Sequence, residues 1–184
     1  MKFEVEVPSE VEVEIDGKVV KVRGPRGELT RDFSSPLFDR KVEIRKEDSK
    51  VVVEAKIERK KILAYAGTVR ALIRNMILGV TKGFRYVMRI HFVHFPMFVS
   101  AKKEGNVTIV EIKNYLGRKT SIVVKVEDVD IEVKENELII RGIDKEKVGL
   151  AASKIEQATR PFREHDRRVF QDGIYLIERG FDSD

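Results

Sequence analysis

Much of this chain occurs twice. The second half, shifted by 87 residues, matches the first without a gap through two strand-like runs, the turn between them and the start of a helix-like stretch. A shift of 90 residues aligns the upstream segments, and the three-residue difference falls in the loop near residues 34–36. A match that carries several elements in step indicates an internal duplication. The aligned positions include Val20 with Val110, Gly27 with Gly117, Val42 with Val129, Ile44 with Ile131, Leu63 with Leu150 and Ala64 with Ala151.

Hydrophobic periodicity predicts the same elements in each half. Apolar and charged residues alternate with period two in short runs, which is the pattern of strands with one buried face. After residue 58, and again after Asp144, apolar residues recur every three or four positions, as in a helix buried on one side. Asp144 is a favourable N-cap, and Gly83 is a favourable C-terminal cap for the first helix. The predicted strands cover residues 10–15, 19–23, 42–45, 51–53, 84–95, 107–112, 121–126, 131–133 and 138–141.

These patterns predict the α+β class, with two duplicated small domains, each an antiparallel β-sheet packed against one α-helix. The first repeat is expected over residues 1–82. The second is expected over residues 83–184 and also carries a basic C-terminal extension. A turn at Asp172-Gly173 is expected to bring Ile174 and Leu176 back as a short strand that anchors this extension.

Composition limits the chemistry that the chain can perform. The absence of cysteine excludes disulfides, thiol nucleophiles and thiolate metal sites. The charged fraction of 36% is high, yet 36 Lys and Arg nearly balance 31 Asp and Glu. This mixture is typical of thermophilic proteins, and it permits a nucleic-acid partner without requiring one. The N-terminus alternates apolar and charged residues, and no apolar run is long enough to cross a bilayer, so we expect a cytoplasmic protein.

A search for catalytic and metal-binding patterns predicts neither. His91 and His94 would face opposite sides of one strand, so we expect them to pack at the junction between the domains rather than share a metal ion. His165 has no evident partner for acid–base chemistry. Residues 24–27, Gly-Pro-Arg-Gly, match the G-x-x-G of an RNA-clamping loop, but strand-like runs on both sides favour a hairpin turn with basic side chains at its rim. We therefore expect no catalytic residue, no metal and no cofactor.

Charge is unevenly distributed within the second half. Acidic residues are concentrated in the predicted strands between positions 127 and 137, whereas four arginines lie between positions 160 and 168. Cations near a helix C-terminus offset the helix dipole, but four exceed this need, and arginine suits bidentate phosphate contacts. On charge alone, an RNA-binding surface and a solvated helix end are equally consistent with the cluster.

Three stretches make the sequence similar to a known family. The duplicated plan, residues 24–29 (Gly-Pro-Arg-Gly-Glu-Leu) and residues 142–149 (Gly-Ile-Asp-Lys-Glu-Lys-Val-Gly) resemble the L-six family of large-subunit ribosomal proteins. Residues 168–175 (Arg-Val-Phe-Gln-Asp-Gly-Ile-Tyr) resemble the signature of its archaeal and eukaryotic branch. The Tyr-Lys-Gly-Lys-Gly type of sequence of the bacterial branch is absent. The resemblance covers essentially the whole chain.

This resemblance implies a non-enzymatic protein of the large ribosomal subunit. It would bind 23S-type rRNA near the stalk base and the factor-binding region, beside neighbouring ribosomal proteins, with no membrane and no small-molecule substrate. The second domain is expected to make the main rRNA contact, and it stays open whether the first touches RNA or protein. The expected RNA-binding residues are Arg118, Lys119, Lys145, Lys147, Lys154, Arg160, Arg163, Arg167, Arg168 and Arg179.

Two hypotheses from other classes remain open on the sequence. A non-ribosomal scaffold would add partner strands to an exposed sheet edge and would bind peptides with weak salt dependence. An RNA-processing enzyme would need a pocket with perturbed acid or base groups.

Overall fold

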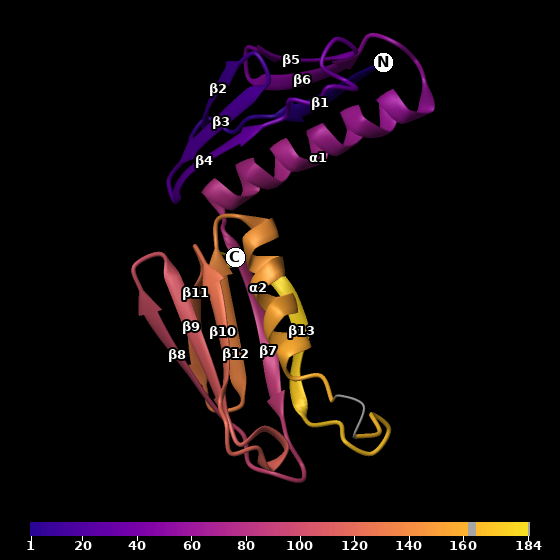
Figure 1. Ribbon diagram of the computed structural model, residues 1–184. Helices are drawn as coiled ribbons and strands as arrows, with labels where there is room; N and C mark the ends of the chain where they lie inside the picture. Colours follow the sequence, from indigo (N-terminus) through magenta and orange to yellow (C-terminus); the bar gives the residue numbers. More distant parts are fainter. Residues whose placement is uncertain (162–164, 184) are drawn as a thin grey trace. The chain divides into compact units, whose positions relative to one another are not determined.

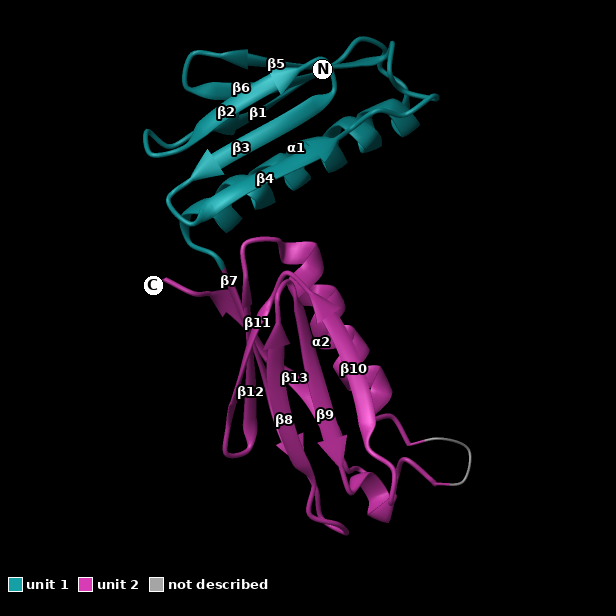
Figure 2. Cartoon of the chain, turned by 60° about the vertical axis from the view of Figure 1, so that its left-hand side comes forward, with its two compact units in different colours: residues 1–83 teal, residues 84–184 magenta. Residues whose placement is uncertain are grey.

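The computed structural model describes residues 1–161 and 165–183. The chain divides into two compact units, residues 1–83 and residues 84–184, coloured separately in Figure 2. Each unit is built from short antiparallel strands and one long helix, and Figure 1 labels them in chain order.

The first unit contains two three-stranded sheets with the strand orders β1-β6-β5 and β2-β3-β4. Its helix α1 packs against both sheets and buries an apolar stripe that includes Ala66, Ile73 and Val80. The core beneath it is formed by alternate strand residues such as Val22 and Val53, which are fully buried. The elements are β1 (Lys2–Glu6), β2 (Glu12–Asp16), β3 (Val19–Gly24), β4 (Gly27–Asp32), β5 (Val42–Glu47), β6 (Lys50–Ala55) and α1 (Lys60–Thr81).

The turn between β3 and β4 is a tight hairpin, as expected, and not a clamp between helices. Gly24 pairs with Gly27 across the turn, and the Arg26 N–H donates a 3.0 Å hydrogen bond to the carbonyl of Val80 near the end of α1. A Cβ at Gly24 would lie 2.7 Å from Cγ2 of Val80, so only glycine permits this close approach. The G-x-x-G sequence therefore joins a hairpin to a helix.

Both predicted helix caps are confirmed. Gly83 has a φ of +69°, and its N–H donates to the carbonyls of Leu78 (3.2 Å) and Gly79 (3.1 Å), which is how a left-handed residue closes a helix. The Asp144 side chain accepts a 2.9 Å hydrogen bond from the Glu146 N–H at the start of α2.

The second unit contains a four-stranded sheet, β11-β12-β7-β13, and a three-stranded sheet, β10-β9-β8. Helix α2 packs against β7, β10, β12 and β13. The strand β13 pairs along the whole of β7, from Gly173 opposite His91 to Phe181 opposite Phe84. The elements are β7 (Phe84–His91), β8 (Phe98–Glu104), β9 (Val107–Lys113), η1 (Tyr115–Gly117), β10 (Ile122–Glu127), β11 (Asp130–Lys134), β12 (Glu137–Gly142), α2 (Lys145–Ala158) and β13 (Gly173–Phe181).

The α+β class and the duplicated plan of sheet plus helix are confirmed. The order β1-β6-β5 recurs as β7-β12-β11, the order β2-β3-β4 recurs as β8-β9-β10, and α1 corresponds to α2. One difference is that the strands of each unit divide between two sheets rather than forming one. A second difference is β13, which the first unit lacks and which occupies the outer edge of β7.

The strand predictions were wrong at three elements, β1, β7 and β8. The strand predicted over residues 84–95 ends at His91, because the N–H groups of Val93 and His94 point to the carboxylate of Asp172 instead of a neighbouring strand. The strands β1 and β8 were missed, although each forms one edge of its sheet. No helix of the described residues is long and apolar enough to span a membrane.

Candidate nucleic-acid interface

The predicted RNA-binding residues lie near the two ends of β7 and along α2. We therefore give the position of each residue relative to the His91 end or the Phe84 end of β7. The His91 end of β7 adjoins the start of β13, the turn η1 and the chain that follows α2. The Phe84 end adjoins the start of α2, where the Lys145 ammonium lies 5.9 Å from the ring centroid of Phe84.

A buried hydrogen-bonded tyrosine connects the loops at the His91 end. The hydroxyl of Tyr115, a residue that is 2% exposed, donates a 2.6 Å hydrogen bond to the carbonyl of Thr159. Burial raises the pKa of Tyr115 to about 12, so the phenol stays protonated and remains a donor at neutral pH. The Thr159 hydroxyl in turn accepts a 2.9 Å hydrogen bond from the Ile174 N–H. Three segments are thereby held together: η1, the end of α2 and the start of β13.

A buried carboxylate holds a fourth segment in place. Asp172 is 1% exposed and accepts hydrogen bonds from the N–H groups of Val93 (3.2 Å) and His94 (3.3 Å) and from the His94 ring (2.9 Å). Burial raises the pKa of Asp172, but these hydrogen bonds together outweigh burial, so the pKa lies below its ordinary value. Asp172 therefore remains a charged acceptor that ties the loop after β7 to the start of β13. We call Tyr115, Thr159, Asp172 and His94 the polar network.

The position of His94 corrects one expectation. His91 and His94 were expected to pack at the junction between the domains, but β7 begins at the domain boundary and His94 follows its opposite end, on Asp172. His94 also lies against Phe170, whose ring centroid is 4.8 Å away, and His165 contacts the same ring edge-on at 4.7 Å. Among the described residues, no group of three or more His, Asp or Glu side chains could hold a metal ion.

The family-like stretch from residue 168 to 175 builds the loop around this network. Gly173 lies so close to the Thr159 carbonyl that a Cβ would stand 3.0 Å from that oxygen. The Tyr175 hydroxyl donates a 2.8 Å hydrogen bond to the carbonyl of Gln171 and closes the turn. These residues therefore position the loop, in which Arg167 and Arg168 are exposed.

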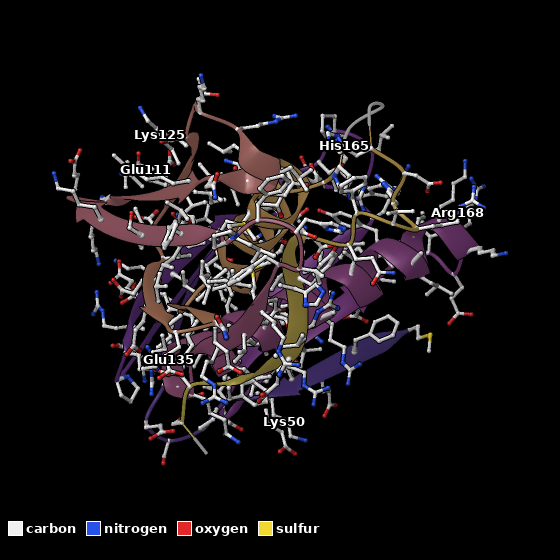
Figure 3. All side chains as sticks on the ribbon, turned by 90° about the horizontal axis from the view of Figure 1, so that it is seen from below. Lys50, Glu111, Lys125, Glu135, His165 and Arg168 are labelled. Atoms are coloured by element: carbon white, nitrogen blue, oxygen red, sulfur yellow. The ribbon has the colours of Figure 1, made fainter. Side chains whose placement is uncertain are left out.

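Five predicted cations lie at the His91 end, and we call them the basic end: Arg118, Lys119, Arg160, Arg167 and Arg168. All five are exposed. Arg118 and Arg160 extend from segments that the Tyr115–Thr159 hydrogen bond joins. Arg168 is labelled in Figure 3, and its side chain is 92% exposed, with a 3.4 Å ion pair to Asp166. Arg163, which was predicted with them, lies outside the described residues.

The remaining predicted cations lie elsewhere in the second unit. Lys145 and Lys147 are in the first turn of α2. Arg179 on β13 lies opposite Tyr86 on β7, so these three cations are near the Phe84 end. Lys154 lies on the exposed side of α2, where it lines a small hollow with Leu150. The structure therefore groups five of the predicted residues and separates the other four described ones from them.

The acidic strands are less acidic than their sequence indicates. Asp128 is paired with Lys147, Asp130 with Lys103, and Glu132 with Arg141. Lys147 is thus a partner of a carboxylate rather than a free cation. At the basic end, by contrast, only Arg168 has a carboxylate within ion-pair distance among the described residues.

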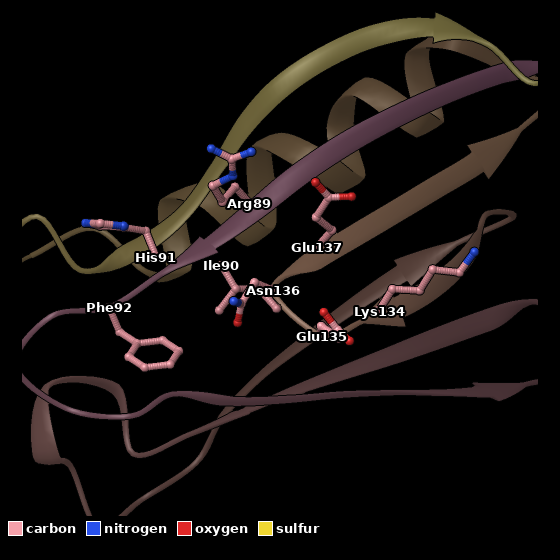
Figure 4. Close-up of a pocket in the computed structure, with 8 residues that line it drawn as sticks. All are labelled: Arg89, Ile90, His91, Phe92, Lys134, Glu135, Asn136 and Glu137. Atoms are coloured by element: carbon pink, nitrogen blue, oxygen red, sulfur yellow. The ribbon is translucent and has the colours of Figure 1, made fainter.

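The largest hollow among those described in the second unit is a mixed polar groove at the His91 end, shown in Figure 4, with a volume of about 840 Å³. Its lining combines cationic and anionic side chains, and within the described part of the chain His91 forms no hydrogen bond with a carboxylate. The lining residues are Arg89, Ile90, His91, Phe92, Lys134, Glu135, Asn136 and Glu137.

Comparison with known proteins agrees with this architecture. Residues 7–83 match the family model described as ribosomal protein L6, a class of ribosomal proteins. The chain is 47% identical over 177 residues to large ribosomal subunit protein uL6 of Desulfurococcus amylolyticus, covering 96% of this chain and 93% of that protein. It is 46% identical over 176 residues to the uL6 of Methanothrix thermoacetophila, covering 95% of each. The chain belongs to the uL6 family of large ribosomal subunit proteins.

Candidate cations were named from the sequence, but the residues that hold their loops together were not. Tyr115, Thr159 and Asp172 carried no recognised motif role, and only Asp172 was noted, as part of a turn. The sequence did contain a signal for Asp172. This carboxylate has apolar residues nearby on both sides in the chain, and a carboxylate in such a place has to be solvated or hydrogen-bonded.

Proposed function

We propose that this chain binds 23S-type rRNA of the large ribosomal subunit through its second unit, near the stalk base and the factor-binding region. The carrying observation is the basic end: five exposed cations on loops that a buried polar network holds in fixed positions. A fixed set of cations loses less conformational freedom on binding than a flexible tail, so it binds a folded RNA more tightly.

The chemistry of this contact is electrostatic. Lys and Arg that neutralise phosphates release counterions, so affinity falls as salt rises. Base edges in A-form RNA grooves are poorly accessible to side chains, and specificity therefore comes from the shape of the folded RNA. Lys145, Lys147, Lys154 and Arg179 would make further contacts away from the basic end, with Lys147 first exchanging Asp128 for a phosphate.

The proposed role requires no catalysis and no cofactor. The chain would act as a structural component that supports translation, in the cytoplasm, beside neighbouring ribosomal proteins. The two repeats, residues 1–82 and 83–184, would act as two domains, and the basic C-terminal extension would belong to the second.

Binding of the full chain to a fragment from the 3′ portion of large-subunit rRNA tests this proposal. Changing Arg160, Arg163, Arg167 and Arg168 together to Ala should weaken binding strongly. The matched control changes four paired strand cations of the same unit to Ala, namely Lys102, Lys103, Lys113 and Lys134, and removes the same charge. Equal binding by the quadruple arginine variant and the unmodified chain would refute the site, and co-sedimentation with large subunits would test the partner.

A further inference from the structure

The charge of the first unit is carried by its helix. Residues 1–58 contain 12 Lys and Arg against 14 Asp and Glu, whereas residues 59–82 contain six Lys and Arg and no acidic residue. The entire positive excess of the first repeat therefore lies on α1 and the residues that flank it. Solvated helices ordinarily mix both signs of charge, because oppositely charged side chains three or four positions apart stabilise the helix.

Three cations on or beside the sheets of the same unit are paired with carboxylates. Lys21 is paired with Glu28 at 3.1 Å, Lys50 with Glu4 at 2.9 Å, and Lys56 with Glu43 at 2.8 Å. On α1, Lys60, Lys61 and Arg74 are exposed, and none of them has an ion-pair partner among the described residues. Arg70 is bound only through a 3.3 Å hydrogen bond to the carbonyl of Glu4. Among the described residues, several strand cations of the first unit are thus paired with carboxylates, whereas Lys60, Lys61 and Arg74 on the helix are not.

These helix cations do not stabilise α1. Lys60 and Lys61 lie in its first turn, where positive charge opposes the helix dipole, and no acidic residue lies in that turn. Arg59 at the N-cap position provides no side-chain hydrogen bond. Arg70 and Arg74 are four positions apart and repel each other. Since folding does not favour this arrangement, we look for its cause in an anionic partner.

The exposed face between the cations carries only short side chains. Ala64, Thr68 and Ala71 are exposed and lie at helical spacing, with Lys60 and Lys61 before them and Arg74 after them. Lys60 and Arg74 are 14 positions apart, which corresponds to roughly 21 Å along the helix axis. Tyr65 does not offer a stacking surface, because its ring stacks on Phe38 at 4.6 Å and its hydroxyl donates to the carbonyl of Phe33.

We propose that this face of α1 is a second RNA-binding surface, and that it fits the backbone and shallow minor groove of an A-form RNA duplex. Side chains this small let the helix approach the wide minor groove closely, while the cations at both ends reach phosphates. Single-stranded RNA fits less well, because its binding depends on exposed aromatic rings, and the described face has none. The inference extends the proposed function to the first unit but requires nothing of the basic end.

The test uses the full chain in which Arg160, Arg163, Arg167 and Arg168 are already Ala, so that the contribution of the second unit is reduced and each further variant is compared with this parent. The probe is a short fluorescent RNA hairpin of arbitrary sequence, followed by anisotropy over a salt series. The triple variant K60Q/K61Q/R74Q should lose roughly tenfold or more in affinity, and its salt slope should decrease by about three. The control K21Q/K50Q/K56Q removes the same charge from paired cations and should bind like its parent.

A second variant separates close approach from charge. Ala71→Gln adds a long neutral side chain to the middle of the face, and glutamine is a good helix former, so the helix is not disturbed. This variant should weaken duplex binding several-fold. Circular dichroism is used to check that its folding is unchanged. Equal losses in both triple variants would mean that only net charge matters and would overturn the proposal. Equal binding of single-stranded RNA, an unaffected Ala71→Gln variant, or more effective competition by polyglutamate than by duplex RNA would also overturn it. Each result leaves the test of the basic end untouched.

Discussion

The ring of His94 donates a 2.9 Å hydrogen bond from Nδ1 to the buried carboxylate of Asp172, across 78 residues of sequence. The carboxylate can only accept, so Nδ1 carries the proton. This contact joins the loop after β7 to the first residue before β13. Burying a carboxylate without hydrogen-bond donors would destabilise the fold. Asp172 avoids this, because its oxygens accept hydrogen bonds from the His94 ring and from main-chain N–H groups.

Asp172→Asn should destabilise the second unit. The amide keeps the size of the side chain but offers one acceptor oxygen in place of two, so its NH2 group faces either the His94 ring or the N–H groups of Val93 and His94 and the network of hydrogen bonds is weakened. We expect a loss of about 1–3 kcal/mol in the free energy of unfolding, measured by urea denaturation. Asp166→Asn is the control, because Asp166 is exposed, and it should change stability far less. Equal effects of the two changes would show that burial of Asp172 is unimportant.

The same carboxylate should contribute a defined pH dependence. Its pKa in the folded chain lies below the ordinary value of 3.8. The stabilisation is therefore complete above the unfolded pKa and is lost as the pH falls through the lower folded pKa. The difference in unfolding free energy between the unmodified chain and Asp172→Asn should shrink in that acidic window. Taking the difference removes the contributions of Glu28 and Glu132, whose pKa values are also lowered by ion pairs. A constant difference down to the lowest pH would contradict this.

Tyr115 should be the last described tyrosine to ionise. Burial raises its pKa to about 12, so its stabilisation is fully present below the ordinary pKa of 10.0 and is lost as the pH rises through about 12. Ultraviolet titration of phenolate should show one late transition that Tyr115→Phe removes. The same variant leaves the Thr159 carbonyl unpaired and should lower stability by about 1 kcal/mol. Retention of the late transition in Tyr115→Phe would assign it to another residue.

Two glycines should respond to alanine in opposite directions. A Cβ at Gly24 would meet Val80 at 2.7 Å, so Gly24→Ala should cost about 1–3 kcal/mol by forcing the hairpin away from α1. Gly67 lies within α1 with no atom near its would-be Cβ, so Gly67→Ala should stabilise by about 1 kcal/mol through helix propensity. Thermal unfolding of both variants measures this, and a stabilising Gly24→Ala would mean that the turn is not held against the helix.

RNA binding by the basic end should be read from its salt slope. Each phosphate contact that is lost should reduce the slope of log affinity against log salt by about 0.7–0.9. The quadruple arginine variant should therefore show a shallower slope than the control in Lys102, Lys103, Lys113 and Lys134. If both variants keep the slope of the unmodified chain, the cations do not contact phosphates.

Sequence reasoning was strongest where a pattern is local and repeated. The two-residue alternation predicted β2, β3 and β5, and the matching apolar stripes predicted α1 and α2, because each pattern depends on one buried face. The caps at Gly83 and Asp144 were also predictable, since helix ends impose strict chemical needs on single positions.

Sequence reasoning failed where a residue depends on a distant partner. The end of β7 at His91 is set by Asp172, and the burial of Tyr115 is set by the Thr159 carbonyl 44 residues away. Pairing of the acidic residues with Lys103, Lys147 and Arg141 likewise follows from how sheets and helix pack together and not from composition. Neither kind of contact leaves a periodic signal in the sequence.

The position of β13 also has a consequence for the order of events during synthesis. All strands of the first unit have been made by residue 55, and its helix by residue 81. In the second unit the edge of β7 and the loop of the basic end both wait for β13, which begins only at Gly173. Since domains fold as the chain emerges from its N-terminus, the first unit can fold well before the basic end takes its final form. A growing chain is thus kept from presenting an assembled basic end until β13 has been added.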